Sequence, residues 1–418
     1  MNIVEHANDF CINYLNCIKK ASKDLWITQS QALCIQSIPY DGISQTNLSK
    51  KLFLDLSTLS RNLDKLINTN PADFIKKFLN VYVDPDCCIP TVGAMHGGFI
   101  CQSIAGRIRK ESSKILYLDP GFPVNKLQTK FLGLQSASID LYDNRGEKLL
   151  ESIEKQFSNG VVGGLLWSSP NNPAWVCLKE EELEGIGKLL SKYDVLGIED
   201  AAYLGMDFRK DYSCPDSPPF IPSIANYTEN YFLIISSSKI FSYAGQRIAM
   251  TVMSPSLMEK RYENLYQFFD TKRVGHAFVH GGIYPTTAGV SRTAQNALAA
   301  LFESANNGDY AFLNEVKVYA ERAKVIKEIF LSNDFQLVYD HDMGEPIGDG
   351  FYFTVSKHDM SGDDLLFLML CHGMAGISLN TTGSKKEGIR ICVSLIRDDQ
   401  INELRDRLAQ LNASVETG

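Results

Sequence analysis

Apolar runs and helical stretches alternate along the chain after residue 70. The apolar runs have the length of buried strands and occupy 115–118, 136–141, 163–167, 195–198, 231–235 and 248–253. Stretches with helical spacing of apolar residues fall among them, at 97–109, 146–157 and 180–193. Strands that alternate with helices in this way predict a mostly parallel sheet with helices packed on it.

The two ends of the chain follow other patterns. The first 69 residues are expected to be helical, with amphipathic segments at 44–53 and 58–67 and a break at Asn68-Thr-Asn-Pro71. The last part begins with a long charged helix over 310–330 and then mixes strands (350–355, 389–394) with helices (362–370, 398–411). We therefore divide the chain into a helical segment (1–69), a large α/β domain (70–305) and a smaller α+β domain (306–418).

Composition and charge limit the classes of protein to which this chain can belong. The chain has 418 residues, of which 44% are hydrophobic and 22% charged, as in folded globular proteins. Its net charge of −8 excludes a polyanion-binding surface spread over the whole chain. No signal peptide and no apolar run of about 18 residues is visible, so we expect a cytoplasmic protein without membrane association.

The ten cysteines show neither a C-x-x-C pair nor zinc-like spacing with histidines, so no metal site is expected. Several lie in apolar runs, such as Cys101 and Cys392. We expect these to be small buried side chains in a reducing compartment.

Polar side chains cluster just after three of the predicted strands. Ser168-Ser-Pro-Asn-Asn-Pro173 follows one, Asp200-Ala-Ala-Tyr203 ends the next, and Ser236-Ser-Ser-Lys239 follows a third, with Arg247 shortly after it. Open α/β sheets bind ligands at the carboxyl ends of their strands, so these residues should share one site. A fourth motif, Gly388-Ile-Arg390, lies in the C-terminal part.

These residue types suit one kind of chemistry. A lysine forms a Schiff base with an aldehyde, and a buried aspartate keeps a pyridine nitrogen protonated so that the ring accepts electrons. Tyrosine and asparagine stabilise an ionised ring oxygen by hydrogen bonding. Serine and arginine hold a phosphate, and a second arginine binds a carboxylate through two parallel donors.

With these motifs in this order, residues 70–418 resemble the pyridoxal-phosphate-dependent enzymes of fold type I, in the class I/II aminotransferase family. The resemblance implies a three-layer α/β fold with a mostly parallel sheet and a smaller α+β C-terminal domain. It implies catalytic roles for Lys239 (the Schiff-base lysine), Asp200 (ring nitrogen) and Tyr203 (ring oxygen). Asn172 would contact both the ring oxygen and the substrate, and Arg390 would bind the substrate carboxylate. Ser236 and Arg247 would hold the phosphate.

The resemblance extends upstream of these motifs. Thr91-Val-Gly-Ala-Met-His-Gly-Gly98 resembles the family's phosphate loop, which implies cofactor contacts from Gly93, Ala94 and Met95. Phe122, in Asp119-Pro-Gly-Phe122, resembles the aromatic residue that stacks on the cofactor ring. Pyridoxal 5′-phosphate, an amino acid with a 2-oxo acid, and a homodimer are the implied cofactor, substrates and assembly. Ala174-Trp175 and Ile248-Ala249 depart from the family pattern.

The first 69 residues resemble a MarR-type helix-turn-helix instead. Its recognition helix would present Ser57, Thr58, Ser60 and Arg61 to DNA, because hydroxyls and an arginine suit groove reading. No wing follows, however, and seven Lys/Arg against six Asp/Glu give this segment a net charge of only +1. A helical bundle that packs on the large domain is the alternative.

Three functions follow from these patterns. The first is an aminotransferase that acts on an amino acid and a 2-oxo acid through Lys239. The second is a MocR-like regulator in which the cofactor domain senses and the N-terminal segment binds DNA. The third is a pyridoxal-phosphate-dependent lyase or cyclase on the same scaffold, since the cofactor motifs are shared and the pocket decides the reaction.

Overall fold

The computed structural model describes residues 69–109 and 113–416. The predictions for the helix-turn-helix and for DNA contacts by Ser57, Thr58, Ser60 and Arg61 lie outside the described residues. None of the described helices is both long and apolar enough to pass through a membrane.

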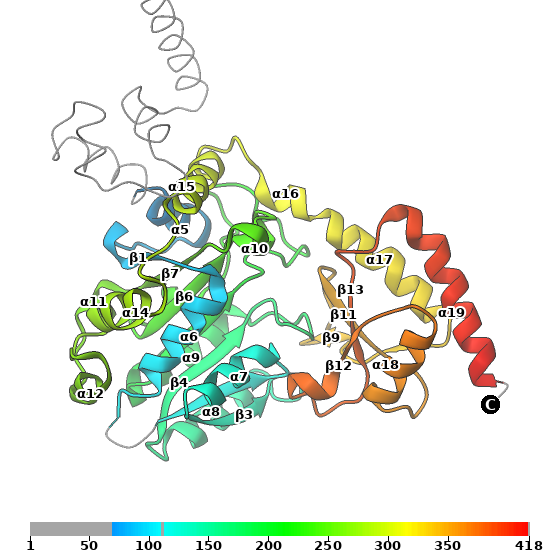
Figure 1. Cartoon of the computed structure of the whole chain (residues 1–418), viewed down its shortest axis with the longest axis horizontal. Coiled ribbons are helices and arrows are strands. Elements are labelled where there is room, and N and C mark those ends of the chain that lie inside the picture. The colour runs from blue at the N-terminus through cyan, green and yellow to red at the C-terminus, as the bar shows by residue number, and fades with distance from the viewer. Residues whose placement is uncertain (1–68, 110–112, 417–418) are drawn as a thin grey trace, which may run out of the picture.

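A seven-stranded sheet forms the centre of the larger part of the molecule (Figure 1). Its strands lie in the order β1 (Cys88–Thr91), β7 (Ala249–Met253), β6 (Tyr231–Ser236), β5 (Leu196–Ala201), β4 (Val162–Ser168), β2 (Lys114–Asp119) and β3 (Gln135–Asp140). The strands from β6 to β3 are parallel, whereas β7 is antiparallel to both of its neighbours. The predicted mostly parallel sheet is therefore confirmed, with one reversed strand.

Helices cover both faces of this sheet and make three layers. Successive strand residues point to opposite faces. In β6, Phe232 and Ile234 pack in one core with α6 (Gly93–Ala105) and the π-helix η5 (Ala277–Ile283). Leu233 and Ile235 belong to the opposite core, which contains residues of α5 (Thr69–Leu79), α8 (Glu147–Phe157), α9 (Glu180–Tyr193) and α15 (Arg292–Asn306).

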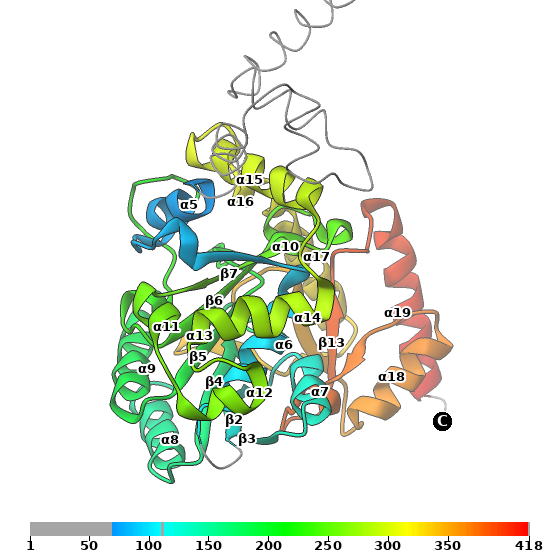
Figure 2. The same cartoon turned by 60° about the vertical axis from the view of Figure 1, so that its left-hand side comes forward.

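The smaller part is built on a four-stranded antiparallel sheet in the order β12 (Ile377–Ser378), β13 (Ile389–Cys392), β11 (Tyr352–Ser356) and β8 (Gln336–Leu337). It lies to one side of the large sheet with α18 (Gly362–Cys371) and α19 (Ile401–Glu416) (Figure 2). Its separate apolar core includes Ile326, Phe353 and Leu408. The expected α+β architecture is confirmed, while the boundary at 305/306 stays a prediction.

Two helix predictions need correction. The helix expected over 310–330 is divided into α16 (Phe312–Val316) and α17 (Val318–Leu331), because the chain tightens at Lys317, whose NH bonds three residues back to the Asn314 carbonyl. The break expected at 68–71 is wrong for Asn70 and Pro71, which lie in helix α5. Asn70 is held there by tertiary contacts, since its amide nitrogen bonds to the Ala299 carbonyl and its own carbonyl accepts from Asn306.

A buried ion network joins the two parts of the molecule. Asp342 of β9 (His341–Asp342) is fully buried and accepts from Arg145 (2.5 Å) and Arg209 (2.7 Å). Arg145 also pairs with the buried Glu182 of α9 through two parallel bonds of 2.9 and 2.7 Å. Burial alone would raise the pKa of Asp342, but the two arginines hold it below its usual value. The network therefore ties the β9 segment to the large sheet's helices as charged groups.

Candidate active site

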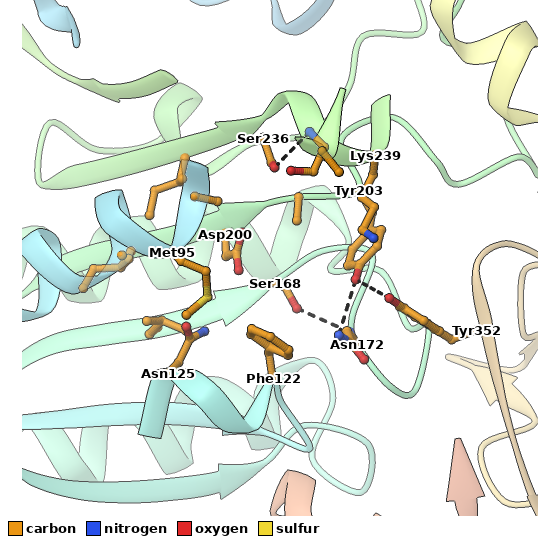
Figure 3. Close-up of a pocket in the computed structure, with 18 of the residues that line it drawn as sticks. Met95, Phe122, Asn125, Ser168, Asn172, Asp200, Tyr203, Ser236, Lys239 and Tyr352 are labelled. Atoms are coloured by element: carbon orange, nitrogen blue, oxygen red, sulfur yellow. Dashed lines mark hydrogen bonds between the residues drawn. The ribbon is translucent and has the colours of Figure 1, made fainter. Parts of the chain in front are cut away.

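A cavity of about 280 Å³ lies where β4, β5 and β6 end, beside the start of α6. The residues predicted from sequence that line it are Ala94, Met95, Phe122, Asn172, Asp200, Tyr203, Ser236, Lys239, Arg247 and Arg390. They converge because parallel strands deliver their carboxyl ends to one edge of the sheet. Figure 3 shows Phe122, Asp200 and Lys239 directed into the same space. The predicted Gly93 lies next to this lining, at the first turn of α6.

Asp200 supplies an acidic group in the cavity. It lies near the end of β5, and its Oδ1 atom is shielded from solvent and has no hydrogen-bond partner among the described residues. Burial raises the pKa of Asp200 to about 6, and a bond from the Ala202 backbone opposes that rise. A desolvated carboxylate with one oxygen unpartnered is poised to receive a cationic donor.

Lys239 is the amine of the cavity. It lies in the one-turn helix α10 (Ser237–Ile240), directly after β6, and its Nζ atom stands 5.3 Å from the centre of the Phe351 ring. No carboxylate pairs with it among the described residues. Burial lowers its pKa, and the nearby Arg390 cation adds to that effect. A neutral amine, the nucleophilic form of lysine, is thereby favoured.

The start of α6 forms the other end of the cavity. Val92, the residue before this helix, offers no side-chain cap, so the first amides, including those of Ala94 and Met95, face outward as donors. Ser236 and Ser238 line the same region, and the Ser238 amide donates to the Ser236 hydroxyl at 3.3 Å. Gly93 has a φ of +72°, which favours glycine, and a Cβ atom there would lie 2.5 Å from an Arg247 guanidinium nitrogen, so a side chain would displace that group.

Four polar side chains form a connected network across the cavity. Arg390 donates to Asn172 at 2.8 Å. Asn172 donates to the Tyr203 hydroxyl at 3.3 Å, and Tyr203 donates to the Tyr352 hydroxyl at 3.0 Å (Figure 3). The Arg390 guanidinium also stands 4.1 Å from the centre of the Tyr352 ring. Its Nε atom is buried and has no partner among the described residues.

Several lining residues were missed by the sequence analysis. Tyr352 begins an apolar strand, and its aromatic side chain gave no sign of a polar partner 149 positions away. Ser168, Asn125 and Ser238 also line the cavity. Ser168 and Ser238 belong to the strand-end motifs at 168–173 and 236–239, so their position directly after a predicted strand was a usable signal.

Two residues named from the sequence, Trp175 and Cys392, lie beside the site. Trp175, which departs from the family pattern, is buried behind the site with its ring centre 5.2 Å from that of Tyr203, so it supports that residue from the side away from the cavity. Cys392, expected to be buried, is only partly so. It follows Arg390 by two residues on β13 and therefore points to the same side, where it influences the pKa of Lys239.

Known proteins resemble this chain both in sequence and in fold. The model of the family "Aminotransferase class I and II" matches residues 68–408. The aspartate aminotransferase of Pyrococcus abyssi is 24% identical over 191 residues, which is 45% of this chain and 47% of that protein. A putative threonine-phosphate decarboxylase of Caldanaerobacter subterraneus is 27% identical over 158 residues, or 36% of this chain and 39% of that protein. The chain thus spans less than half the length of these curated relatives.

Solved structures share the fold. An aromatic aminotransferase from Pyrococcus horikoshii superposes with a TM-score of 0.66 at 18% identity, covering 84% of this chain and 86% of that one. An aspartate aminotransferase from Thermus thermophilus with maleate gives 0.65 at 16% identity, covering 83% and 81%. With the family match over most of the sequence, this chain belongs to the class I and II aminotransferase family of pyridoxal-5′-phosphate-dependent enzymes.

Proposed function

We propose that this chain transfers the amino group of an amino acid to a 2-oxo acid in the cavity between β5, β6 and α6. One observation carries the proposal: Asp200, whose buried Oδ1 atom has no partner among the described residues, and Lys239, an amine with a lowered pKa, line the same cavity. A pyridine aldehyde requires such a pair: an acidic group at its ring nitrogen and a nucleophilic amine at its aldehyde carbon.

The residues present fit pyridoxal 5′-phosphate. Asp200 would hold the ring nitrogen, since its unpartnered Oδ1 atom needs a donor. The amides of Ala94 and Met95, the Ser236 hydroxyl and Arg247 would hold the phosphate, because a helix start and a guanidinium both bind anions. Arg247 is exposed and has no acidic partner among the described residues, so its charge is available.

When bound, the cofactor supplies an electron sink for negative charge at the substrate α-carbon. Asp200 would keep the ring nitrogen protonated, because the ionised carboxylate and the protonated nitrogen stabilise each other. Tyr203 and Asn172 would donate toward the ring oxygen, and Arg390 would hold the substrate carboxylate. Lys239, as a neutral amine, would take the proton from the substrate α-carbon and deliver it to the former aldehyde carbon of the cofactor, on the other side of the amino nitrogen.

The test is a mass balance on the purified protein with pyridoxal phosphate, an amino acid pool and a 2-oxo acid. We expect a visible cofactor band that requires Lys239, loss of that band on adding an amino acid, and one new amino acid formed for each one consumed. Lys239→Ala should abolish all three. A band that amino acids leave unchanged would contradict the proposal.

Decarboxylation is the second candidate, because the match to a putative threonine-phosphate decarboxylase is of the same order as that to an aminotransferase. Both reactions use the same electron sink, and the pocket decides which bond at the α-carbon breaks. Carbon dioxide measured in the same incubation separates them. Release of carbon dioxide in step with amino acid loss, without a 2-oxo acid product, would favour this candidate.

A further inference from the structure

The polar network of the cavity closes on Tyr352, a residue outside the motifs that carry the family resemblance. Its hydroxyl accepts from Tyr203 at 3.0 Å, and its ring lies under the Arg390 guanidinium at 4.1 Å. Tyr352 therefore contacts both the group expected at the cofactor's ring oxygen and the group expected at the substrate carboxylate.

We propose that Tyr352 is a positioning residue that links the charge state of the Arg390 site to the hydrogen bond that Tyr203 donates into the cavity. This inference rests on the proposed function for the roles of Arg390 and Tyr203. The Tyr352 ring also packs against the Arg390 guanidinium, so the hydroxyl of this side chain contacts Tyr203 while its ring contacts Arg390.

The link requires that the donor and the acceptor of the Tyr203–Tyr352 hydrogen bond can exchange roles. In the structure, the Tyr203 hydroxyl donates to Tyr352. An acceptor on the cavity side of Tyr203 would take that proton, which leaves the Tyr352 hydroxyl free to donate to the Tyr203 oxygen. A hydroxyl that accepts a hydrogen bond becomes a stronger donor in its turn. Tyr352 would thereby strengthen the bond from Tyr203 to a ring oxygen.

Arg390 controls how well Tyr352 donates. Burial raises the pKa of the Tyr352 hydroxyl, and the Arg390 cation over the ring opposes that rise. A carboxylate bound to Arg390 cancels this charge and weakens the donation. The other titratable groups that act on Tyr352 and Tyr203 are Asp200 and Cys392, and Cys392 and Arg390 also act on Lys239. Asn172 also bridges Arg390 and Tyr203 through hydrogen bonds of 2.8 and 3.3 Å, but among the described titratable groups only Tyr352 contacts both.

The experiment is a pH titration of the visible cofactor band in the holoenzyme, with and without saturating propionate as an unreactive carboxylate. In Tyr352→Phe, which keeps the ring, we expect the pKa of the band without propionate to rise by about 0.5, which is about three-fold in proton affinity. The further rise that propionate causes in the wild type should shrink by at least half. Tyr212→Phe removes a buried hydroxyl outside the cavity and should titrate as the wild type does.

A second variant tests the ring. Tyr352→Leu should weaken propionate binding about ten-fold, whereas Tyr352→Phe should change it less than two-fold, because only the former removes the platform under Arg390. Titrations of Tyr352→Phe that superpose on those of the wild type, with and without propionate, would overturn the link. Both readouts need only bound cofactor, so they remain decisive if the wild type forms the band but transfers no amino groups, which would overturn the proposed function alone.

Discussion

Replacement of Asp200 by asparagine should stabilise the cofactor-free protein and weaken cofactor binding at the same time. The buried Oδ1 atom of its carboxylate has no partner among the described residues, and burial raises the pKa of Asp200 from 3.8 to about 6. That difference corresponds to about 3 kcal/mol of penalty on the ionised form, counted against the unfolded chain.

The sign of the pH dependence follows from the raised pKa. Between about pH 4 and pH 6 the folded, cofactor-free protein binds more protons than the unfolded chain, so its free energy of unfolding falls as the pH rises through this window. Above about pH 6 the full penalty is present. An asparagine side chain at this position carries no charge, so at pH 8 the D200N variant should be more stable than the wild type by up to about 3 kcal/mol.

Cofactor binding should change in the opposite direction. A protonated ring nitrogen beside Asp200 converts the penalty into a charge-assisted hydrogen bond, and loss of such a bond in a desolvated site costs about 2–3 kcal/mol, or about 100-fold in affinity. In the wild type, affinity should fall about ten-fold between pH 7 and pH 5 as Asp200 takes up a proton, and D200N should lose this part of the pH dependence.

Two measurements test this reasoning. Thermal unfolding of the cofactor-free and cofactor-saturated proteins at pH 5 and pH 8 reports stability, and absorbance titration reports the cofactor dissociation constant. Glu199→Gln is the matched control, since Glu199 is the preceding residue of β5, is buried among Ser223 and Ile224, and does not line the cavity. A cofactor-free D200N no more stable than the wild type at pH 8, or a loss of affinity equal to that of E199Q, would refute the reasoning.

Further predictions concern the substrate, the ion network, the amine and the assembly. Arg390→Ala should raise the KM for carboxylate substrates about 100-fold through loss of a charge-assisted clamp, measured by steady-state kinetics, and an unchanged KM would exclude Arg390 from substrate binding. Asp342→Ala should cost about 3–5 kcal/mol in denaturant unfolding, because it removes the buried carboxylate that Arg145 and Arg209 share, while Glu182 stays beside Arg145 and Asp207 beside Arg209. Because the pKa of Lys239 is lowered, cofactor-free protein should react with an added aldehyde at a pH where model lysines are still protonated, which mass spectrometry of the reduced adduct can locate. The family resemblance implies a homodimer, so light scattering should give the mass of two chains, and a monomer would contradict it.

Much of the fold and site could be predicted because the signals are local. The helix predicted over 180–193 is observed as Glu180–Tyr193, where three acidic residues occupy the first turn. The strand-end motifs were recognisable because each follows an apolar run, and the parallel topology brings them together. The pairing of Tyr203 with Tyr352 and the reversal of β7 were not predictable, because they depend on partners far away in the sequence.

The Asp342 network bears on how the cavity can open. Asp342 joins β9 to Arg145 and Arg209, and it also accepts a hydrogen bond from the Cys177 backbone. Movement of β9 away from the larger part would therefore separate buried charges from their partners. On the Arg390 side, the smaller sheet meets the larger part through the Arg390–Asn172 and Tyr203–Tyr352 hydrogen bonds and through uncharged ring contacts of Tyr352 with Tyr203 and Trp175. The displacement that costs least is therefore a rotation about the Asp342 end, which makes this network a pivot and gives Arg390 and Tyr352 the longest travel when substrate enters.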